Sequence, residues 1–257
     1  MPNTPLVKID NCYLKHEDQN ITGSAKDRAI ISQIANLKKQ GFKTAVISST
    51  GNAAISAAYF CEQNQIELTI FLSTKVNPKK LEILKLYPAK IILAKKPISD
   101  AIKFSKKNHA YLLRQSTDPS ALLGYQQIGQ EIMTQLPKIT SIFIPIGSGT
   151  TLLGISQALP TTVKIFAVKP ENTTLTDALT VKFQPLKNKI ISTVKNSKGL
   201  ELIIQNEDII SSQKFLEKNN IQTSNESALA LAGYFKTIKN NIAVGDFPVI
   251  LLTGAKR

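Results

Sequence analysis

The sequence predicts an α/β fold in which parallel sheets are covered on both faces by helices. Continuous apolar runs of strand length, such as residues 141–147 (SIFIPIG) and 247–254 (FPVILLTG), are typical of strands buried on both faces. Helix-like segments separate these runs almost throughout the chain, as expected for parallel strands joined by helical crossovers. With 257 residues and 42% hydrophobic residues, the chain is large enough to form one or two domains.

The expected elements follow one another in a regular order. The expected strands are residues 44–49, 66–73, 89–94, 110–114, 141–147, 163–169 and 247–254. The expected helices are residues 52–64, 77–87, 97–108, 118–136 and 150–159, with two more near 208–219 and 226–240. Between 170 and about 200 the pattern is less regular. Ligands of such folds bind at the carboxyl ends of the strands, so the turns that follow the strands are the places to search for a site.

Composition excludes several classes of function. The net charge is +14, but Lys and Arg are scattered along the chain, and there is no Trp to stack on bases. We therefore expect no specific nucleic-acid binding, although a basic surface attracts small anions. No apolar run approaches the roughly 20 residues that a membrane helix needs, and no apolar leader opens the chain. We expect a cytoplasmic protein that does not associate with membranes.

Cysteine and histidine are both rare. Cys12 and Cys61 lie in unrelated contexts, which predicts reduced thiols and no disulfide. His16 and His109 are the only histidines, so we expect no metal site and place both side chains at the surface.

A lysine stands at the start of a predicted helix within residues 21–30 (ITGSAKDRAI). Thr22 or Ser24 can cap this helix, and Asp27 suits its first turn. The cation of Lys26 opposes the helix dipole there, which is easier to understand if its amine forms an imine or lies beside an anion. The alternative is a solvated lysine on the surface.

Two glycine-containing turns follow strands. Residues 48–52 (SSTGN) join a strand to an Ala-rich helix, and the backbone amides at such a junction can bind a carboxylate, although a plain capped junction has the same pattern. Residues 147–151 (GSGTT) also lie between a strand and a helix, and their amides and hydroxyls can coordinate a phosphate. This second loop is neither a Walker loop nor a GxGxxG fingerprint. Thr253 ends the last strand and by itself indicates no more than a strand end.

Taken in order, these segments resemble the fold type II, or tryptophan synthase β-like, enzymes that depend on pyridoxal 5'-phosphate (PLP). Residues 21–29 (ITGSAKDRA) are similar to the family's N-P-T-G-S-x-K-D-R, residues 48–54 (SSTGNAA) to its S-[ST]-G-N-[TA]-[AG], and residues 147–154 (GSGTTLLG) to its G-x-G-[GT]-[TN]-x-x-G. Residues 251–254 (LLTG) are similar to the L-T-G of threonine synthases. Residues 11–20 (NCYLKHEDQN) and 223–234 (TSNESALALAGY) also resemble family segments.

The resemblance implies a role for each candidate residue. Lys26 would be catalytic and form the Schiff base with PLP, Asn52 would bond the PLP ring hydroxyl, and Thr253 would face the pyridine nitrogen. The PLP phosphate would be bound by the glycine loop, which consists of Gly147, Ser148, Gly149, Thr150 and Thr151. The substrate carboxylate would be bound by the asparagine turn, which consists of Ser49, Thr50, Gly51 and Asn52.

The resemblance also implies an overall organisation. We expect a smaller α/β domain at residues 20–118 and a larger one at residues 1–19 and 119–257, each with an open, mostly parallel sheet flanked by helices. We further expect a homodimer that acts on a small amino acid.

The reaction is less closely defined than the cofactor. The chain looks most like threonine synthase, a lyase that converts O-phosphohomoserine to threonine. However, Ala121 and Leu123 replace the arginine and the acid of the family's N-P-x-R-x-E-G, so a phosphate contact is missing. Cysteine synthase-like replacement and serine or threonine ammonia-lyase activity stay open. A third possibility is a binding or regulatory protein that keeps the PLP fold without catalysis.

Overall fold

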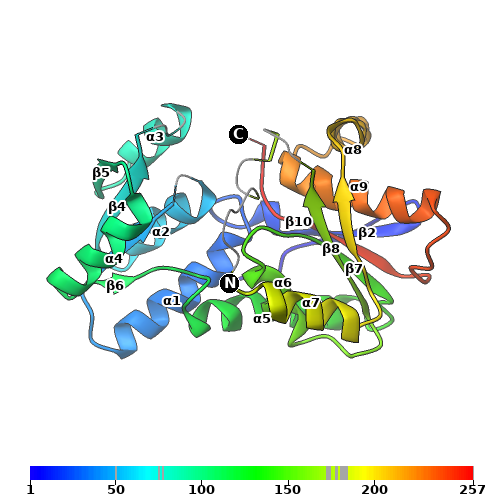
Figure 1. Ribbon diagram of the computed structural model, residues 1–257, viewed down its shortest axis with the longest axis horizontal. Helices are drawn as coiled ribbons and strands as arrows, with labels where there is room; N and C mark the ends of the chain where they lie inside the picture. Colours follow the sequence, from blue (N-terminus) through cyan, green and yellow to red (C-terminus); the bar gives the residue numbers. More distant parts are fainter. Residues whose placement is uncertain are drawn as a thin grey trace. The chain divides into compact units, whose positions relative to one another are not determined.

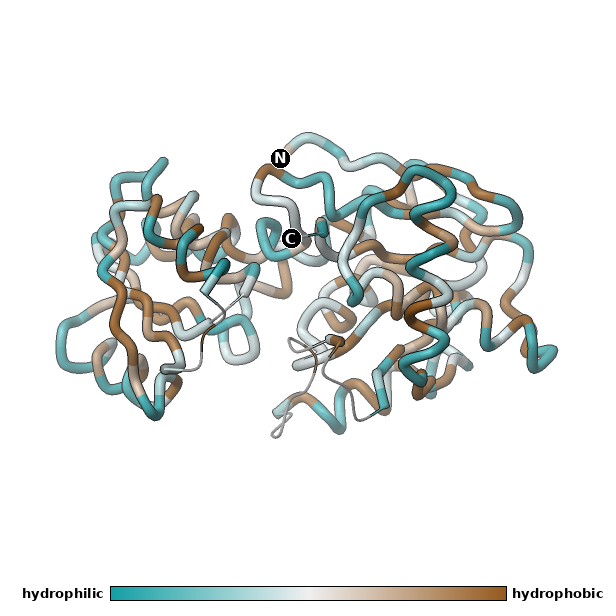
Figure 2. Tube along the Cα trace, turned by 90° about the horizontal axis from the view of Figure 1, so that it is seen from above, coloured by the Kyte–Doolittle hydropathy of each residue, from teal (hydrophilic) through white to brown (hydrophobic). Residues whose placement is uncertain are grey.

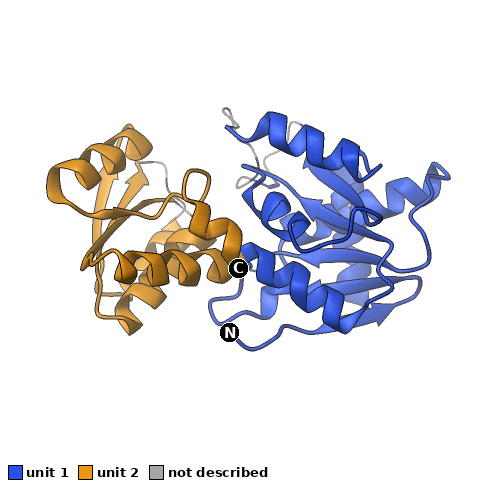
Figure 3. Cartoon of the chain, turned by 90° about the horizontal axis from the view of Figure 1, so that it is seen from below, with its two compact units in different colours: residues 1–25, 125–257 blue, residues 26–124 orange. Residues whose placement is uncertain are grey.

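The computed structural model describes residues 1–49, 51–74, 76, 78–171, 175–176, 179 and 185–256. The chain divides into two compact units, which Figure 3 colours separately. Unit 1 comprises Met1–Ala25 and Tyr125–Arg257, and unit 2 comprises Lys26–Gly124. The sequence prediction placed the smaller domain at residues 20–118. Its first and last residues each lie six residues before those of unit 2.

Unit 2 is a four-stranded parallel sheet with helices packed on it (Figure 1). The strand order is β5-β4-β3-β6, and every pairing is parallel. Its elements are α1 (Lys26–Lys39), β3 (Thr44–Ser48), α2 (Asn52–Gln63), β4 (Glu67–Ser73), α3 (Pro78–Lys85), β5 (Lys90–Ala94), α4 (Pro97–Asn108), β6 (Tyr111–Leu112) and the start of α5 (Pro119–Gln135).

Unit 1 is built on a six-stranded sheet with the order β1-β2-β10-β7-β8-β9. The first two strands form an antiparallel hairpin, and the other pairings are parallel. Its elements are β1 (Leu6–Ile9), β2 (Cys12–His16), η1 (Glu17–Gln19), the rest of α5, β7 (Ser141–Pro145), α6 (Thr150–Ser156), β8 (Lys164–Pro170), α7 (Lys187–Asn196), β9 (Glu201–Ile204), α8 (Asn206–Lys218), α9 (Asn225–Lys239) and β10 (Pro248–Leu252). Both units therefore confirm the predicted α/β class.

Each unit has its own apolar core along its strands. All five residues of β7 and of β10 are buried, as expected for parallel strands covered on both faces. Figure 2 shows hydrophobic stretches inside each unit and hydrophilic residues on the outer turns. In unit 1, α9 contributes an almost fully buried run from Ser227 to Tyr234, which packs against β7, β8 and β10. The central strands are thus held rigidly, and so are the turns that follow them.

The structure corrects several details of the prediction. His16 is 5% exposed, not at the surface, because its Nδ1 lies 3.1 Å from Asp18 Oδ1 and within 3.3 Å of the Gln19 amide. His109 is exposed, as predicted, and stacks on Phe42. Ser24 does not cap α1, because the helix begins at Lys26 and the buried Ser24 hydroxyl has no hydrogen-bond partner among the described residues.

The cysteines agree with the prediction of reduced thiols. Cys12 and Cys61 are free and buried in unit 1 and unit 2, respectively. Burial raises the pKa of each thiol to about 12, so both thiols stay protonated and unreactive at neutral pH. Among the described residues, no helix is both long and apolar enough to cross a bilayer.

Candidate active site

Three neighbouring parallel strands of unit 1 end at the same edge of the sheet. β10 lies between β2 and β7, and Leu252 pairs with His16. The residue after β10 is Thr253, and β7 leads through Ile146 into the glycine loop. Thr253 and the glycine loop therefore follow adjacent strands at the carboxyl edge of the sheet, where ligands bind in open α/β folds.

The segment before Lys26 is hydrogen bonded to the end of β10. The Ala25 amide donates to the Thr253 carbonyl at 3.0 Å, and the Ala255 amide donates to the Gly23 carbonyl at 2.9 Å. Between these bonds, Ser24 and Gly254 form an antiparallel bridge. Ala25, the residue directly before Lys26, is therefore hydrogen bonded within unit 1 to the residue that carries the Thr253 hydroxyl.

The first turn of α9 fixes Gly254 from the other side. The Gly254 carbonyl accepts from the Ser224 amide and the Thr223 hydroxyl, both at 2.7 Å. The Ser227 hydroxyl lies 3.2 Å from both the amide and the carbonyl oxygen of Gly254, and Ser227 is fully buried. The sequence had indicated only that this segment resembles a family segment. These bonds give it a physical role as the support of the Thr253 turn.

The glycine loop has the geometry of an anion site. Gly149 is the N-cap residue of α6 and has φ of +84°, a left-handed conformation that favours glycine. In the described part of the chain, no hydrogen bond engages the backbone amides of residues 148–151. The hydroxyls of Ser148 and Thr150 lie 3.1 Å apart. Four available amides and two hydroxyls at a helix start fit a phosphate group.

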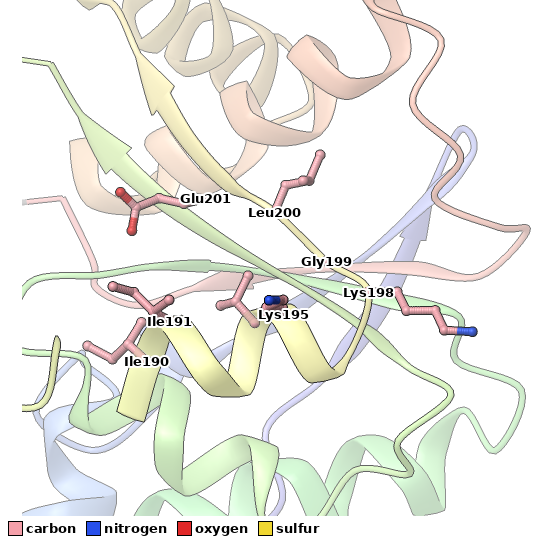
Figure 4. Close-up of a pocket in the computed structure, with 8 residues that line it drawn as sticks. Ile190, Ile191, Lys195, Lys198, Gly199, Leu200 and Glu201 are labelled. Atoms are coloured by element: carbon pink, nitrogen blue, oxygen red, sulfur yellow. The ribbon is translucent and has the colours of Figure 1, made fainter. Parts of the chain in front are cut away.

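Helix α7 closes the space beside Gly149. A Cβ atom added to Gly149 would lie 2.0 Å from Ile190 Cδ1. The same Ile190 also lines a cavity of about 330 Å³ between α7 and β9 (Figure 4). That cavity is mostly apolar and contains none of the candidate residues, so we do not assign it to the active site. Its other lining residues are Ile191, Val194, Lys195, Lys198, Gly199, Leu200 and Glu201.

Replacing Gly149 by alanine is expected to destabilise the protein by about 1–3 kcal/mol, because both the positive φ and the contact with Ile190 are unfavourable for a Cβ. The same distortion of the loop should weaken PLP binding. Urea unfolding and a PLP titration followed by absorbance would measure the two effects. Gly41→Ala is the matched control, because Gly41 has φ of +77° with no atom near its Cβ position. Equal losses in the two variants would show that Ile190 contributes nothing.

In unit 2, Lys26 and Asn52 are the first residues of two helices that pack together. α1 leads into the start of β3 and α2 leaves the end of β3, so both helices begin at the carboxyl edge of the sheet. The two helices share one apolar core, and Lys26 is partly buried at this edge. The topology therefore places the two candidate residues at one edge of the same unit.

The asparagine turn leaves room for a ligand. The Gly51 amide donates to the Ser49 hydroxyl at 3.3 Å, and Gly51 is the N-cap residue of α2. A Cβ added to Gly51 would meet no atom within 4 Å. Such open space beside a helix N-terminus suits a carboxylate. The substrate-binding prediction for Thr50 falls outside the described residues.

Comparison with known proteins supports the resemblance. A sequence model of the family described as "Pyridoxal-phosphate dependent enzyme" matches residues 1–254. A threonine synthase from Methanosarcina acetivorans is 27% identical over 297 aligned positions, which cover 97% of this chain and 73% of that protein. An L-threonine ammonia-lyase from Thermotoga maritima is 30% identical over 168 positions, which cover 62% of this chain but only 42% of that protein.

A solved structure supports the fold. The processed form of threonine deaminase isoform 2 from Solanum lycopersicum superposes with a TM-score of 0.87 at 20% sequence identity. The match covers 100% of this chain and 80% of that chain. The likeness confirms the predicted tryptophan synthase β-like fold.

Proposed function

Since this chain belongs to the family of pyridoxal-phosphate dependent enzymes, we propose that it is a lyase that performs elimination or replacement on the side chain of a small amino acid. The proposed reaction is that of threonine synthase, which converts O-phosphohomoserine to threonine. The main support is the fixed pairing of the Lys26 segment with Thr253, since Ala25 donates to the Thr253 carbonyl at 3.0 Å. The threonine synthase relative, aligned over 97% of the chain, points to the same reaction.

PLP, when bound, supplies an electron sink for the negative charge that develops at the substrate Cα. Lys26 would hold the cofactor covalently, and its amine, once displaced by the amine of the substrate, would take the proton from the substrate Cα as a general base. The amides of the glycine loop bind the phosphate of the cofactor. Asn52 would bond its ring hydroxyl, and the turn formed by Ser49, Thr50, Gly51 and Asn52 would orient the substrate carboxylate.

Thr253 bears on the choice of reaction. If its neutral hydroxyl faced the ring nitrogen, it would not hold that nitrogen protonated as a carboxylate would. The weaker electron sink would suit loss of a leaving group from Cβ or Cγ. The group would depart with the bonding electrons after loss of the Cα proton, and of a Cβ proton as well when it stands on Cγ, and water or another nucleophile would then add to the unsaturated carbon while a proton returns to the substrate.

A second candidate is a threonine or serine ammonia-lyase. It is favoured by the relative from Thermotoga maritima, which is 30% identical over 62% of this chain. Cysteine synthase-like replacement is a further alternative within the same chemistry. If no reaction occurs, the remaining proposal is a PLP-binding regulatory protein.

A substrate panel separates these candidates. The purified protein is incubated with O-phosphohomoserine, O-acetylserine, serine and threonine, while release of phosphate, acetate and keto acid is measured. We expect phosphate and threonine from O-phosphohomoserine. Keto acid from threonine without phosphate release would instead identify an ammonia-lyase, and acetate release would identify a cysteine synthase-like enzyme.

We also propose that the protein is a cytoplasmic homodimer, as the family resemblance and the two free thiols suggest. Light scattering of the purified protein should give twice the 28.2 kDa mass of the chain. A monomeric mass would contradict the dimer.

A further inference from the structure

Arg114 lies at the carboxyl edge of the sheet of unit 2, beside the strand that leads into the asparagine turn. β6 pairs with β3 in parallel, with Leu112 opposite Val46. The Leu113 amide donates to the Val46 carbonyl at 2.9 Å, which is a hydrogen bond of this same pair of Val46 and Leu112. Arg114 follows the end of β6 by two residues, so it lies at the carboxyl end of a strand that neighbours β3.

The main chain of Arg114 is fixed by hydrogen bonds, while its guanidinium meets no acceptor among the residues that the structure describes. The Arg114 amide donates to the Leu112 carbonyl at 2.8 Å, and its own carbonyl accepts from the Thr117 amide at 3.0 Å. The side chain is half-buried. Within the described residues, no carboxylate pairs with the guanidinium and no side-chain hydrogen bond engages it. An arginine has five N–H donors, so a partly desolvated guanidinium of this kind is suited to an external anion.

The first carboxylate after Arg114 in the sequence is that of Asp118, and both of its oxygens already accept hydrogen bonds. Asp118 Oδ2 accepts from the Tyr111 hydroxyl at 2.6 Å and from Gln33 Nε2 at 2.7 Å. Asp118 Oδ1 accepts from the amide and the hydroxyl of Ser120 at 2.9 and 2.6 Å. Burial and this hydrogen bond raise the pKa of Tyr111, so its hydroxyl stays protonated and continues to donate. The Asp118 carboxylate is thus satisfied by hydrogen bonds at the start of α5 without a contact from Arg114.

The described residues of the neighbouring elements include few other groups that could bind the same anion. The strand on the other side of β3 is β4, and the described residue that follows it is the uncharged Thr74. Ala121 on α5 is fully buried and has no polar side-chain atom. The same helix approaches α1 so closely that a Cβ at Gly124 would lie 2.1 Å from the Arg28 carbonyl oxygen. Within the described part of unit 2, Lys26 and Arg114 are both cations at the carboxyl edge of the sheet, and the proposed function assigns Lys26 to PLP, which leaves Arg114 for a second anion.

We propose that Arg114 is a specificity-determining residue that binds a second anionic group of the substrate, at the end remote from the α-carboxylate. This inference rests on the proposed function, in which the asparagine turn orients the α-carboxylate. A phosphate on the side chain of the substrate would receive two parallel N–H bonds from the guanidinium. The site would then select small amino acids that carry a phosphate over those with a neutral leaving group.

Phosphate binding tests the proposal without turnover. Inorganic phosphate is titrated calorimetrically into the PLP-loaded protein, in which the cofactor occupies the glycine loop. We expect Arg114→Gln to weaken phosphate binding by about 10- to 100-fold and Arg114→Lys by less, because lysine cannot form the bidentate contact. Lys107→Gln removes an exposed charge from α4 of the same unit and should change binding by no more than about twofold. Wild-type binding in Arg114→Gln, or no binding by the wild type, would overturn the proposal.

The second measurement is the ratio of kcat/KM for O-phosphohomoserine to that for O-acetylhomoserine. We expect Arg114→Gln to lower this ratio by about 10- to 100-fold. If the ratio stays at the wild-type value, Arg114 is not the specificity residue, whereas the proposed reaction stands. If only the acetylated substrate reacts, the threonine synthase reaction is wrong, and the phosphate titration still decides the role of Arg114. Thermal unfolding of each variant confirms that it is folded.

Discussion

Lys26→Ala is expected to give a colourless protein whose turnover falls by at least about 10²- to 10⁴-fold, the usual effect of losing a general acid–base group. The loss should exceed that range if the covalent attachment of PLP also depends on this amine. The reason is that alanine has no amine to form the imine or to take the proton, while the segment before Lys26 keeps its main-chain bonds. Ala25 is bonded to Thr253, and the segment is also held by the bond from Ala255 to Gly23.

The absorbance spectrum and the mass of the borohydride-reduced protein are the measurements. Reduction should fix the cofactor on the peptide that contains Lys26 in the wild-type protein and on no peptide in the variant. Lys39→Ala is the matched control, because Lys39 is an exposed residue in the last turn of the same helix. It should retain colour and turnover. Cofactor fixed to another lysine would exclude Lys26 from the proposed role.

The central strands were predictable because they are buried on both faces. β7 and β10 are fully buried, so their sequences are continuous apolar runs. α7, in contrast, lies in the stretch that the sequence left irregular, and β9, which follows that stretch, was not predicted either. α7 buries only Ile190 and Val194 among its ten residues, and β9 is an edge strand in which buried and exposed residues alternate. Elements with so few buried residues give a weak apolar pattern.

The candidate site was predictable as a set of motifs but not as a set of contacts. The motifs follow the ends of strands, and topology alone then brings Thr253 and the glycine loop to one edge. The bonds that hold the site join residues far apart in sequence, such as Ala25 with Thr253, and no local pattern contains them. The burial of His16 has the same origin, because its strand β2 pairs with β10 and His16 lies opposite Leu252. The roles of Lys26 and Asn52 stay predictions.

A buried ion pair in unit 1 should carry the largest effect on stability. Lys15 is fully buried, and its ammonium lies 2.7 Å from Glu131 Oε2, 2.8 Å from the Thr4 carbonyl and 3.0 Å from Gln135 Oε1. The Thr4 hydroxyl in turn donates to Glu17 at 2.6 Å. These bonds tie the N-terminal segment, β2 and α5 together. The cluster therefore supports β2, which pairs with β10 and leads through η1 into the segment before Lys26.

Lys15→Met is expected to destabilise the protein by about 3–5 kcal/mol, because it leaves the Glu131 carboxylate buried without its cation. Adding Glu131→Leu to this variant should recover much of the loss, since a buried pair can often be replaced by apolar residues. Urea unfolding of the wild type, both single variants and the double variant gives the coupling energy between the two residues.

The exposed pair of Lys169 and Glu201, 2.6 Å apart, is the matched control, and Lys169→Ala should cost no more than about 1 kcal/mol. A double variant as unstable as the sum of the single variants would mean that the two charges do not stabilise each other.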